Sequence, residues 1–312
     1  MTDITNPIFH DVDKARAHLE AIRWPNGPIC PHCGDVDHAT KLDGKSTRPG
    51  VYKCKSCRKP FSVTVGTLFE RSKIPLNKWI LATHLMSSSK KGMSAHQLHR
   101  MLGITYKSAW FMAHRIREAM REPIPEPRSM GGPGKIVEAD ETFVGGKEKN
   151  RHKSKRAKTR LGGSWGKETV FSLVERGGKV HSRHTKSVAA KTLRPILVTQ
   201  LQGDTHLMTD DAGQYRHMGK DFKHSAVNHS AGEYVRGEAH TNTIESYFAI
   251  LKRGIIGVYH HVSAKHLKRY LGEFDFRYNQ RTATDFERAD LALKGITGKR
   301  MTYRRTGEWA TA

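Results

Sequence analysis

The chain has 312 residues, with 54 Lys and Arg against 30 Asp and Glu, and a formal net charge of +24. This excess favours a polyanionic partner, usually DNA or RNA, although ribosomal and membrane-surface proteins carry similar charge. No apolar run reaches the roughly 20 residues of a membrane span, and the start MTDITNPIF lacks the pattern of a secretory signal, so we expect a cytoplasmic, nucleoid-associated protein.

The first predicted domain, residues 1–70, combines a short helix with a zinc ribbon. Its cysteines form two C-x2-C pairs separated by 20 residues: Cys30, Cys33, Cys54 and Cys57. Two such pairs supply four thiolates to one tetrahedral zinc ion. Gly34 follows the first pair, where the turn needs a residue that tolerates positive φ, and residues 51–53 and 61–65 have strand-like composition. The zinc is expected to be structural, and whether the ribbon also contacts DNA stays open.

Residues 71–125 are predicted to be helical and to contact DNA. Two helical patterns flank Gly103, and Ser94 and Thr105 are suitable N-caps, as in a helix-turn-helix. The expected core between the helices comprises Leu98, Met101, Leu102, Ile104, Ala109 and Met112. The residues expected to face DNA are Tyr106, Lys107, His114, Arg115 and Arg117. An ordinary helical hairpin would show the same pattern.

Residues 133–281 alternate strand and helix patterns, and the tail 282–312 is expected to be peripheral. Strands are predicted at 135–139, 169–174, 179–182, 205–209 and 225–228, with helices at 188–201 and 241–253. Three strands, a helix, two further strands and a final helix follow the order of a ribonuclease-H-like fold. The whole chain is therefore predicted to be an α+β multidomain protein.

Three acidic residues fall where that fold places its catalytic carboxylates: Asp140 on the first strand, Asp210 after the fourth, and Glu245 on the late helix. Several neighbours compete for these roles: Glu138, Glu141, Asp204, Asp211 and, as an alternative third ligand, Asn242.

Carboxylates in this arrangement suit the hydrolysis and transfer of DNA phosphodiesters. Two Mg²⁺ or Mn²⁺ ions about 4 Å apart can serve both the attacking and the leaving oxygen, and such hard cations prefer oxygen ligands. Asp140 would bridge the two ions, while Asp210 and Glu245 would each help to hold one. Lys252 lies seven positions after Glu245, on the same helix face, and is expected to contact a phosphate.

A basic segment at 147–160 contains eight Lys and Arg against one Glu and follows the first acidic motif. Such a run is usually a solvated loop, but its position favours a role in clamping DNA phosphates. The residues assigned to that contact are Lys153, Lys155, Arg156 and Lys158, together with Arg253 beside Lys252.

Several motifs, in order, resemble the ISXO-like transposases of bacterial insertion sequences. The segments 23–34 and 66–76 resemble the ribbon region of that family, and 138–147 resembles its first catalytic motif. Thr209-Asp210 resembles the second motif, and 240–245 with 251–255 resembles the third. The closing signature is matched by 273–279, so the resemblance covers about residues 10–281.

The resemblance implies a catalytic domain of the DDE type that cleaves the 3′ ends of terminal inverted repeats and joins them to target DNA. It also implies a homo-oligomer on paired double-stranded DNA ends, and a third catalytic position that varies between members, which keeps Asn242 in consideration. A transposase-derived regulator that binds DNA without catalysis is the alternative, and a nuclease that cuts but never joins is a third possibility.

Overall fold

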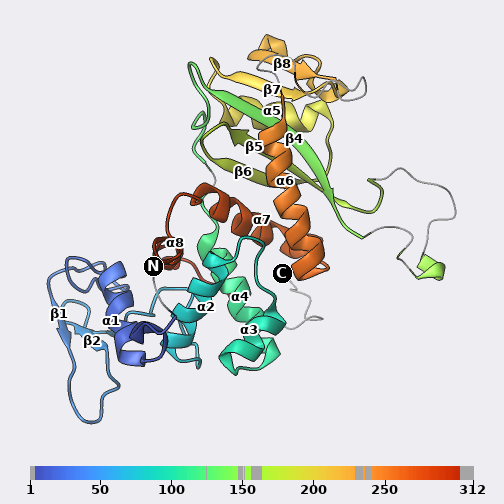
Figure 1. Ribbon diagram of the computed structural model, residues 1–312. Helices are drawn as coiled ribbons and strands as arrows, with labels where there is room; N and C mark the ends of the chain where they lie inside the picture. Colours follow the sequence, from blue (N-terminus) through green and yellow to red (C-terminus); the bar gives the residue numbers. More distant parts are fainter. Residues whose placement is uncertain are drawn as a thin grey trace, which may run out of the picture. The chain divides into compact units, whose positions relative to one another are not determined.

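The computed structural model describes residues 4–123, 125–146, 150, 152–155, 164–228, 235 and 240–302 (Figure 1). The chain divides into two compact units. One comprises residues 1–121 and 282–312, and the other comprises residues 122–281. No helix in the described part of the chain is both long and apolar enough to cross a membrane.

The first unit begins with helix α1 (Val12–Arg23) and a small antiparallel sheet. The sheet has the order β1 (Ala39–Lys41), β2 (Val51–Cys54), β3 (Pro60–Ser62), so the two predicted strands are confirmed, the second ending earlier than expected. Trp24, which follows α1, packs edge-on against Tyr52 and Phe61, with ring centroids 5.5 and 5.8 Å apart. These aromatic contacts attach α1 to the ribbon.

Three helices follow: α2 (Leu76–Ser88), α3 (Ala95–Leu102) and α4 (Tyr106–Met120). The predicted caps are confirmed, because Ser94 accepts a hydrogen bond from the Gln97 amide and Thr105 accepts one from the Ser108 amide. Gly103 ends α3 at a φ of 59°, in the left-handed region that glycine tolerates. Most of the predicted core is buried, but Met101 is 48% exposed and was wrongly assigned to it.

The prediction of a peripheral tail after residue 282 is wrong. Helix α8 (Asp285–Lys294) packs against α2, and Leu293 and Ile296 are buried. Beyond it, the Lys299 ammonium donates to the carbonyls of Glu118 and Arg121, both at 2.8 Å, at the C-terminal end of α4. The segments predicted as separate domains, 1–70 and 71–125, therefore form one unit that the tail completes.

Replacing Gly295 by Ala is expected to destabilise this first unit by about 1–3 kcal/mol, the usual cost of overpacking. A Cβ at this position would overlap the backbone carbonyl oxygen of Ala119, which cannot move as a side chain can. Urea denaturation measures the effect. Gly44→Ala is the matched control, since its Cβ would meet only the Thr47 hydroxyl at 3.6 Å. Equal stability of the two variants would contradict the tight packing of the tail.

The second unit is built on a five-stranded mixed sheet. Its strands are β4 (Ile136–Val144), β5 (Glu168–Glu175), β6 (Val180–Thr185), β7 (His206–Asp210) and β8 (Lys223–Val227). Their order is β6-β5-β4-β7-β8. The first three are antiparallel neighbours, whereas β7 and β8 run parallel to β4. This order and these directions confirm the predicted ribonuclease-H-like arrangement.

Helices cover both faces of this sheet. Helix α5 (Ala190–Gln200) contributes Leu193 and Leu197 to the core on one face, despite its internal Pro195. Helices α6 (Asn242–Gly254) and α7 (Ala264–Asn279) form the core on the other face. A π-helical turn, Ile255–Tyr259, extends α6. The central strand β4 is thus enclosed on both sides.

A buried polar network fixes α6 and α7 on the sheet. The carboxylate of Asp275 accepts hydrogen bonds from the Tyr247 hydroxyl at 2.5 Å and from the Ser182 amide at 2.8 Å. The Ser182 hydroxyl also donates to Asp275, at 2.7 Å. Burial raises the pKa of Asp275 to about 7, although these hydrogen bonds oppose the shift.

This raised pKa predicts a pH dependence of stability. The folded chain holds the Asp275 proton more tightly than the unfolded chain, so stability is lost as pH rises from about 4 to about 7 and then levels off. In Asp275→Asn this loss is absent. Between pH 5 and pH 8 its free energy of unfolding should therefore gain about 2–3 kcal/mol relative to the wild type, because one pKa unit corresponds to about 1.4 kcal/mol. Urea denaturation of both proteins at the two pH values measures this, and a constant difference would contradict it.

Candidate active site and zinc site

The four cysteines converge as the spacing predicted. Cys30 and Cys57 place their sulfur atoms 3.7 Å apart, and those of Cys33 and Cys54 are 3.6 Å apart. Four thiolates about 2.3 Å from one zinc ion stand about 3.8 Å from each other in a tetrahedron. The quartet therefore fits a structural zinc ion.

The two turns of the quartet have matching backbone geometry. The Cys30 amide donates to the Asp35 carbonyl at 2.9 Å, and the Cys54 amide donates to the Lys59 carbonyl at 3.2 Å. The residue after each pair has positive φ: 79° at Gly34, as predicted, and 60° at Arg58. The positive φ of Arg58 was not predicted, because glycine is the only residue type that indicates this conformation in a sequence.

The sheet brings Asp140 and Asp210 together. In the parallel pairing of β4 with β7, Glu138 lies opposite Met208. Two residues further along their strands come Asp140 and Asp210, so side-chain alternation places both on one face. That face is the one covered by α6, because Val144, at the same alternation as Asp140, packs with α6 residues.

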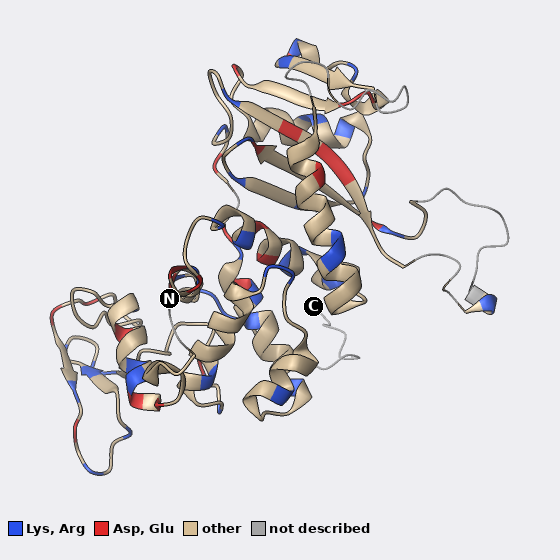
Figure 2. Ribbon diagram, viewed as in Figure 1, with Lys and Arg blue, Asp and Glu red and all other residues tan. Residues whose placement is uncertain are grey.

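Helix α6 adds Glu245 in its first turn, where the carboxylate accepts a hydrogen bond from the Thr241 hydroxyl at 3.0 Å. Asn242 is the first residue of the helix, and both side chains are exposed. Figure 2 shows the acidic positions of β4 and α6 beside each other and basic positions at the far end of α6.

The three carboxylates interact electrostatically. Burial raises the pKa of Asp140 to about 8, and the negative charges of Glu141, Asp210 and Glu245 add to that shift. Such crowding is unfavourable without a counter-charge, and a divalent cation supplies one. Among the described residues, the four cysteines form the only group of three or more potential metal ligands whose ligand atoms all lie within 4.8 Å of one another. The ligand atoms of the three carboxylates are spaced more widely than this.

The competing acidic residues are either engaged by other groups or exposed. Glu138 is completely buried and engaged by neighbouring groups. Glu141 is hydrogen-bonded to Tyr215 and Gln214, and burial raises its pKa to about 7. Asp204 and Asp211 are exposed.

Part of the predicted DNA-facing surface is wrong. Arg117 is 2% exposed and His114 is 1% exposed, so neither side chain is placed to contact DNA. Arg115 is half-buried and donates to the carbonyls of Glu70 and Met301 at 3.3 and 3.1 Å, which ties segments of the first unit together. These residues lie toward the middle and end of α4. They belong to the packed face of the helix, whereas the prediction placed them on its exposed face.

Other predicted DNA contacts remain accessible. Tyr106 and Lys107 are exposed at the start of α4, and Lys252 and Arg253 are exposed in the last turn of α6. In the basic segment, Lys153 is exposed and begins the short helix Lys153–Lys155. Arg156 and Lys158 lie outside the described residues.

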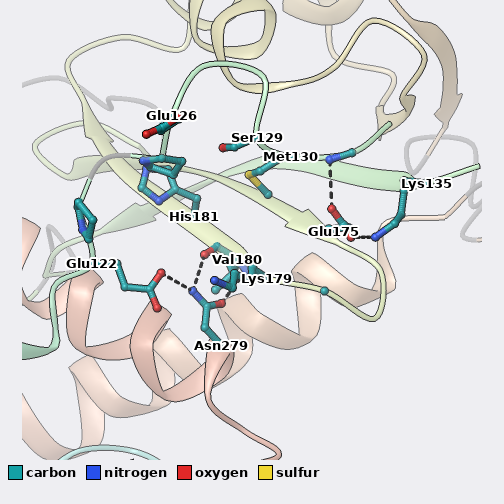
Figure 3. A pocket seen from close by; sticks show the side chains of 14 residues that line it. Glu122, Glu126, Ser129, Met130, Lys135, Glu175, Lys179, Val180, His181 and Asn279 are labelled. Carbon is teal, nitrogen blue, oxygen red and sulfur yellow. Dashed lines mark hydrogen bonds and ion pairs between the residues drawn. The ribbon is translucent and has the colours of Figure 1, made fainter. Parts of the chain in front are cut away.

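A separate cavity of about 740 Å³ lies in the second unit (Figure 3). It is lined by residues 122, 123, 125, 126 and 129–131, by Lys135, by residues 175 and 178–181 at the turn between β5 and β6, and by Asn279. One wall is His181, whose pKa burial lowers to about 4. None of the predicted catalytic residues lines it, so the cavity is distinct from the acidic cluster.

Two family models match this chain. The profile of the ISXO2-like transposase domain matches residues 131–279, and that of the transposase zinc-ribbon domain matches residues 11–60. The acidic cluster and the cysteine quartet lie within these two regions. The chain is 31% identical over 283 residues to an uncharacterized protein in transposable element ISH50 of Halobacterium salinarum, covering 87% of this chain and 92% of that protein. The chain therefore belongs to the ISXO2-like family of zinc-ribbon transposases.

Proposed function

We propose that this protein cleaves the 3′ ends of the terminal inverted repeats of an insertion sequence and joins them to target DNA, using two divalent metal ions. The observation that carries the proposal is the convergence of Asp140, Asp210 and Glu245 on one face of the sheet. There, burial together with the negative charges of Glu141, Asp210 and Glu245 raises the pKa of Asp140 to about 8. The family membership supports the same chemistry.

Asp140 and Asp210 would hold the metal ions from the sheet, and Glu245 would hold them from α6. When bound, Mg²⁺ or Mn²⁺ ions activate the attacking oxygen and stabilise the leaving oxygen of an in-line displacement. The protein's own contribution is to hold three oxygen ligands in place. Asn242 stays the alternative third ligand, since it lies one turn before Glu245.

Exposed basic residues would hold the DNA. Lys252 follows Glu245 by two helical turns, and Arg253 is its neighbour, so phosphates next to the acidic cluster would meet positive charge. Lys107 and the basic segment with Lys153 and Lys155 would contribute further phosphate contacts. We also propose that the protein acts as a homo-oligomer on paired DNA ends.

The proposal is tested by incubating the purified protein with labelled DNA that carries the flanks of its own gene, and with Mg²⁺ or Mn²⁺. Cleavage at the 3′ ends, followed by strands longer than the substrate, supports the transposase. Shortened strands without joining indicate a nuclease, and binding without any cleavage indicates a regulator.

The same assay assigns the third ligand. Glu245→Gln is expected to lose both steps, whereas Asn242→Ala retains them. Loss of activity in Asn242→Ala alone would transfer the role to Asn242.

A further inference from the structure

Glu138 joins the central strand to the start of α6. Its side chain is fully buried on the β4 face that also carries Asp140. One carboxylate oxygen accepts a hydrogen bond from the Thr243 hydroxyl, and the other accepts one from the Ile244 amide, both at 2.9 Å. Because Ile244 directly precedes Glu245, this contact fixes where α6 presents its carboxylate.

Arg176 extends the connection to two more segments. Its Nε donates to Glu138 at 2.6 Å, and a terminal nitrogen donates to the His240 carbonyl at 2.9 Å. The same nitrogen lies 2.9 Å from the sulfur of Met208. Arg176 therefore reaches β4, β7 and the segment before α6.

Each of these contacts lies next to one acidic residue of the proposed active site. Glu138 precedes Asp140 by two residues, and Met208 precedes Asp210 by two. We infer that buried Glu138 and partly buried Arg176 form a clamp that sets the spacing of the three carboxylates. The inference rests on the proposed function. Both members are positioning residues, since neither is assigned a contact with metal or DNA.

Stability alone does not explain such a pair. A buried ion pair is often no more stabilising than apolar residues of the same volume, because both charges lose their hydration. Glu138 also adds a negative charge on the strand face that carries Asp140, and Arg176 balances this charge. The pair differs from apolar residues in making directed hydrogen bonds. These bonds join β4 to β7, to the segment before α6 and to α6 itself.

The clamp predicts that Glu138→Gln weakens metal binding about tenfold or more, the usual effect of removing a group that orients metal ligands. The Gln amide keeps the shape of the side chain, but its NH2 group cannot accept from the Ile244 amide or the Thr243 hydroxyl. The affinity of the full-length protein for Mn²⁺ is measured without DNA by electron paramagnetic resonance. DNA cleavage by the variant should recover when Mn²⁺ is raised, which a merely destabilised protein would not show.

Glu175→Gln is the matched control. Glu175 is adjacent to Arg176 and also forms an ion pair, with Lys135 at 2.5 Å, but that pair borders the separate cavity in Figure 3. Its Mn²⁺ affinity should equal that of the wild type. Arg176→Lys keeps the charge but reaches fewer partners, so its Mn²⁺ affinity should fall as in Glu138→Gln. It replaces Glu138→Gln in the test if the Glu138→Gln protein does not fold.

These measurements distinguish failure of the clamp from failure of the proposed function. If the wild type binds Mn²⁺ and cuts DNA, and Glu138→Gln and Arg176→Lys bind Mn²⁺ as tightly as Glu175→Gln, the clamp is wrong and the proposed function stands. If the wild type neither binds Mn²⁺ nor cuts DNA, the proposed function is overturned and the clamp with it.

Discussion

Replacing Asp140 by Asn is expected to reduce DNA cleavage and joining by at least about a thousandfold, since metal ions that serve both oxygens contribute several kcal/mol. The same substitution is expected to stabilise the metal-free protein. Burial and the negative charges of three neighbouring residues raise the pKa of Asp140 to about 8. At neutral pH the carboxyl must therefore bind a proton when the chain folds, a cost that the neutral amide does not carry. Product analysis on gels and thermal unfolding without metal measure the two effects.

Asp211→Asn is the control for this experiment. Asp211 is exposed and follows Asp210 directly, so the variant removes one negative charge near the site without removing a proposed ligand. It should retain cleavage and joining. An Asp140→Asn protein that cuts at the wild-type rate would remove Asp140 from the active site, whatever its stability.

Loss of zinc is expected to unfold the ribbon, because metal binding supplies on the order of 10 kcal/mol to so small a fold. Cys54→Ser should have the same effect, since Cys54 is completely buried and a hydroxyl is a poor zinc ligand. Near-ultraviolet circular dichroism would report the loss of the Trp24, Tyr52 and Phe61 cluster. Zinc content is measured in parallel by atomic absorption.

His32→Ala is the control for the zinc site. His32 lies between Cys30 and Cys33, and histidine is a common zinc ligand, but its side chain is exposed and outside the quartet. The variant should keep one zinc ion and the aromatic signal. A fully folded Cys54→Ser protein without zinc would show that packing, and not the metal, holds the ribbon.

The parts of the structure that local patterns determine could be predicted from the sequence. The cysteine spacing identified the zinc site, and apolar and β-branched residues indicated the strands of the second unit. The positions of Asp140 and Asp210 followed from these strands. The caps at Ser94 and Thr105 were also visible, because they depend on residues only a few positions apart.

Features that depend on distant contacts could not be predicted. The sequence shows that α8 has an apolar side, but not that this side packs on α2, about 200 residues earlier. Arg115 and Arg117 look like DNA contacts because arginine is usually exposed, and only the fold shows what covers them. Glu138 and Asp140 share one strand face, so their order in the sequence does not separate their roles. Only the position of Arg176 shows that Glu138 belongs to the clamp, which leaves Asp140 as the proposed metal ligand.

The first unit has a discontinuous chain, since residues 1–121 are completed by residues 282–299. The second unit, residues 122–281, is therefore inserted into the chain of the first unit. During synthesis it can fold as soon as it leaves the ribosome, whereas the first unit must wait for α8 and Lys299. A premature stop near residue 281 would thus leave an intact second unit attached to an incomplete, aggregation-prone first unit.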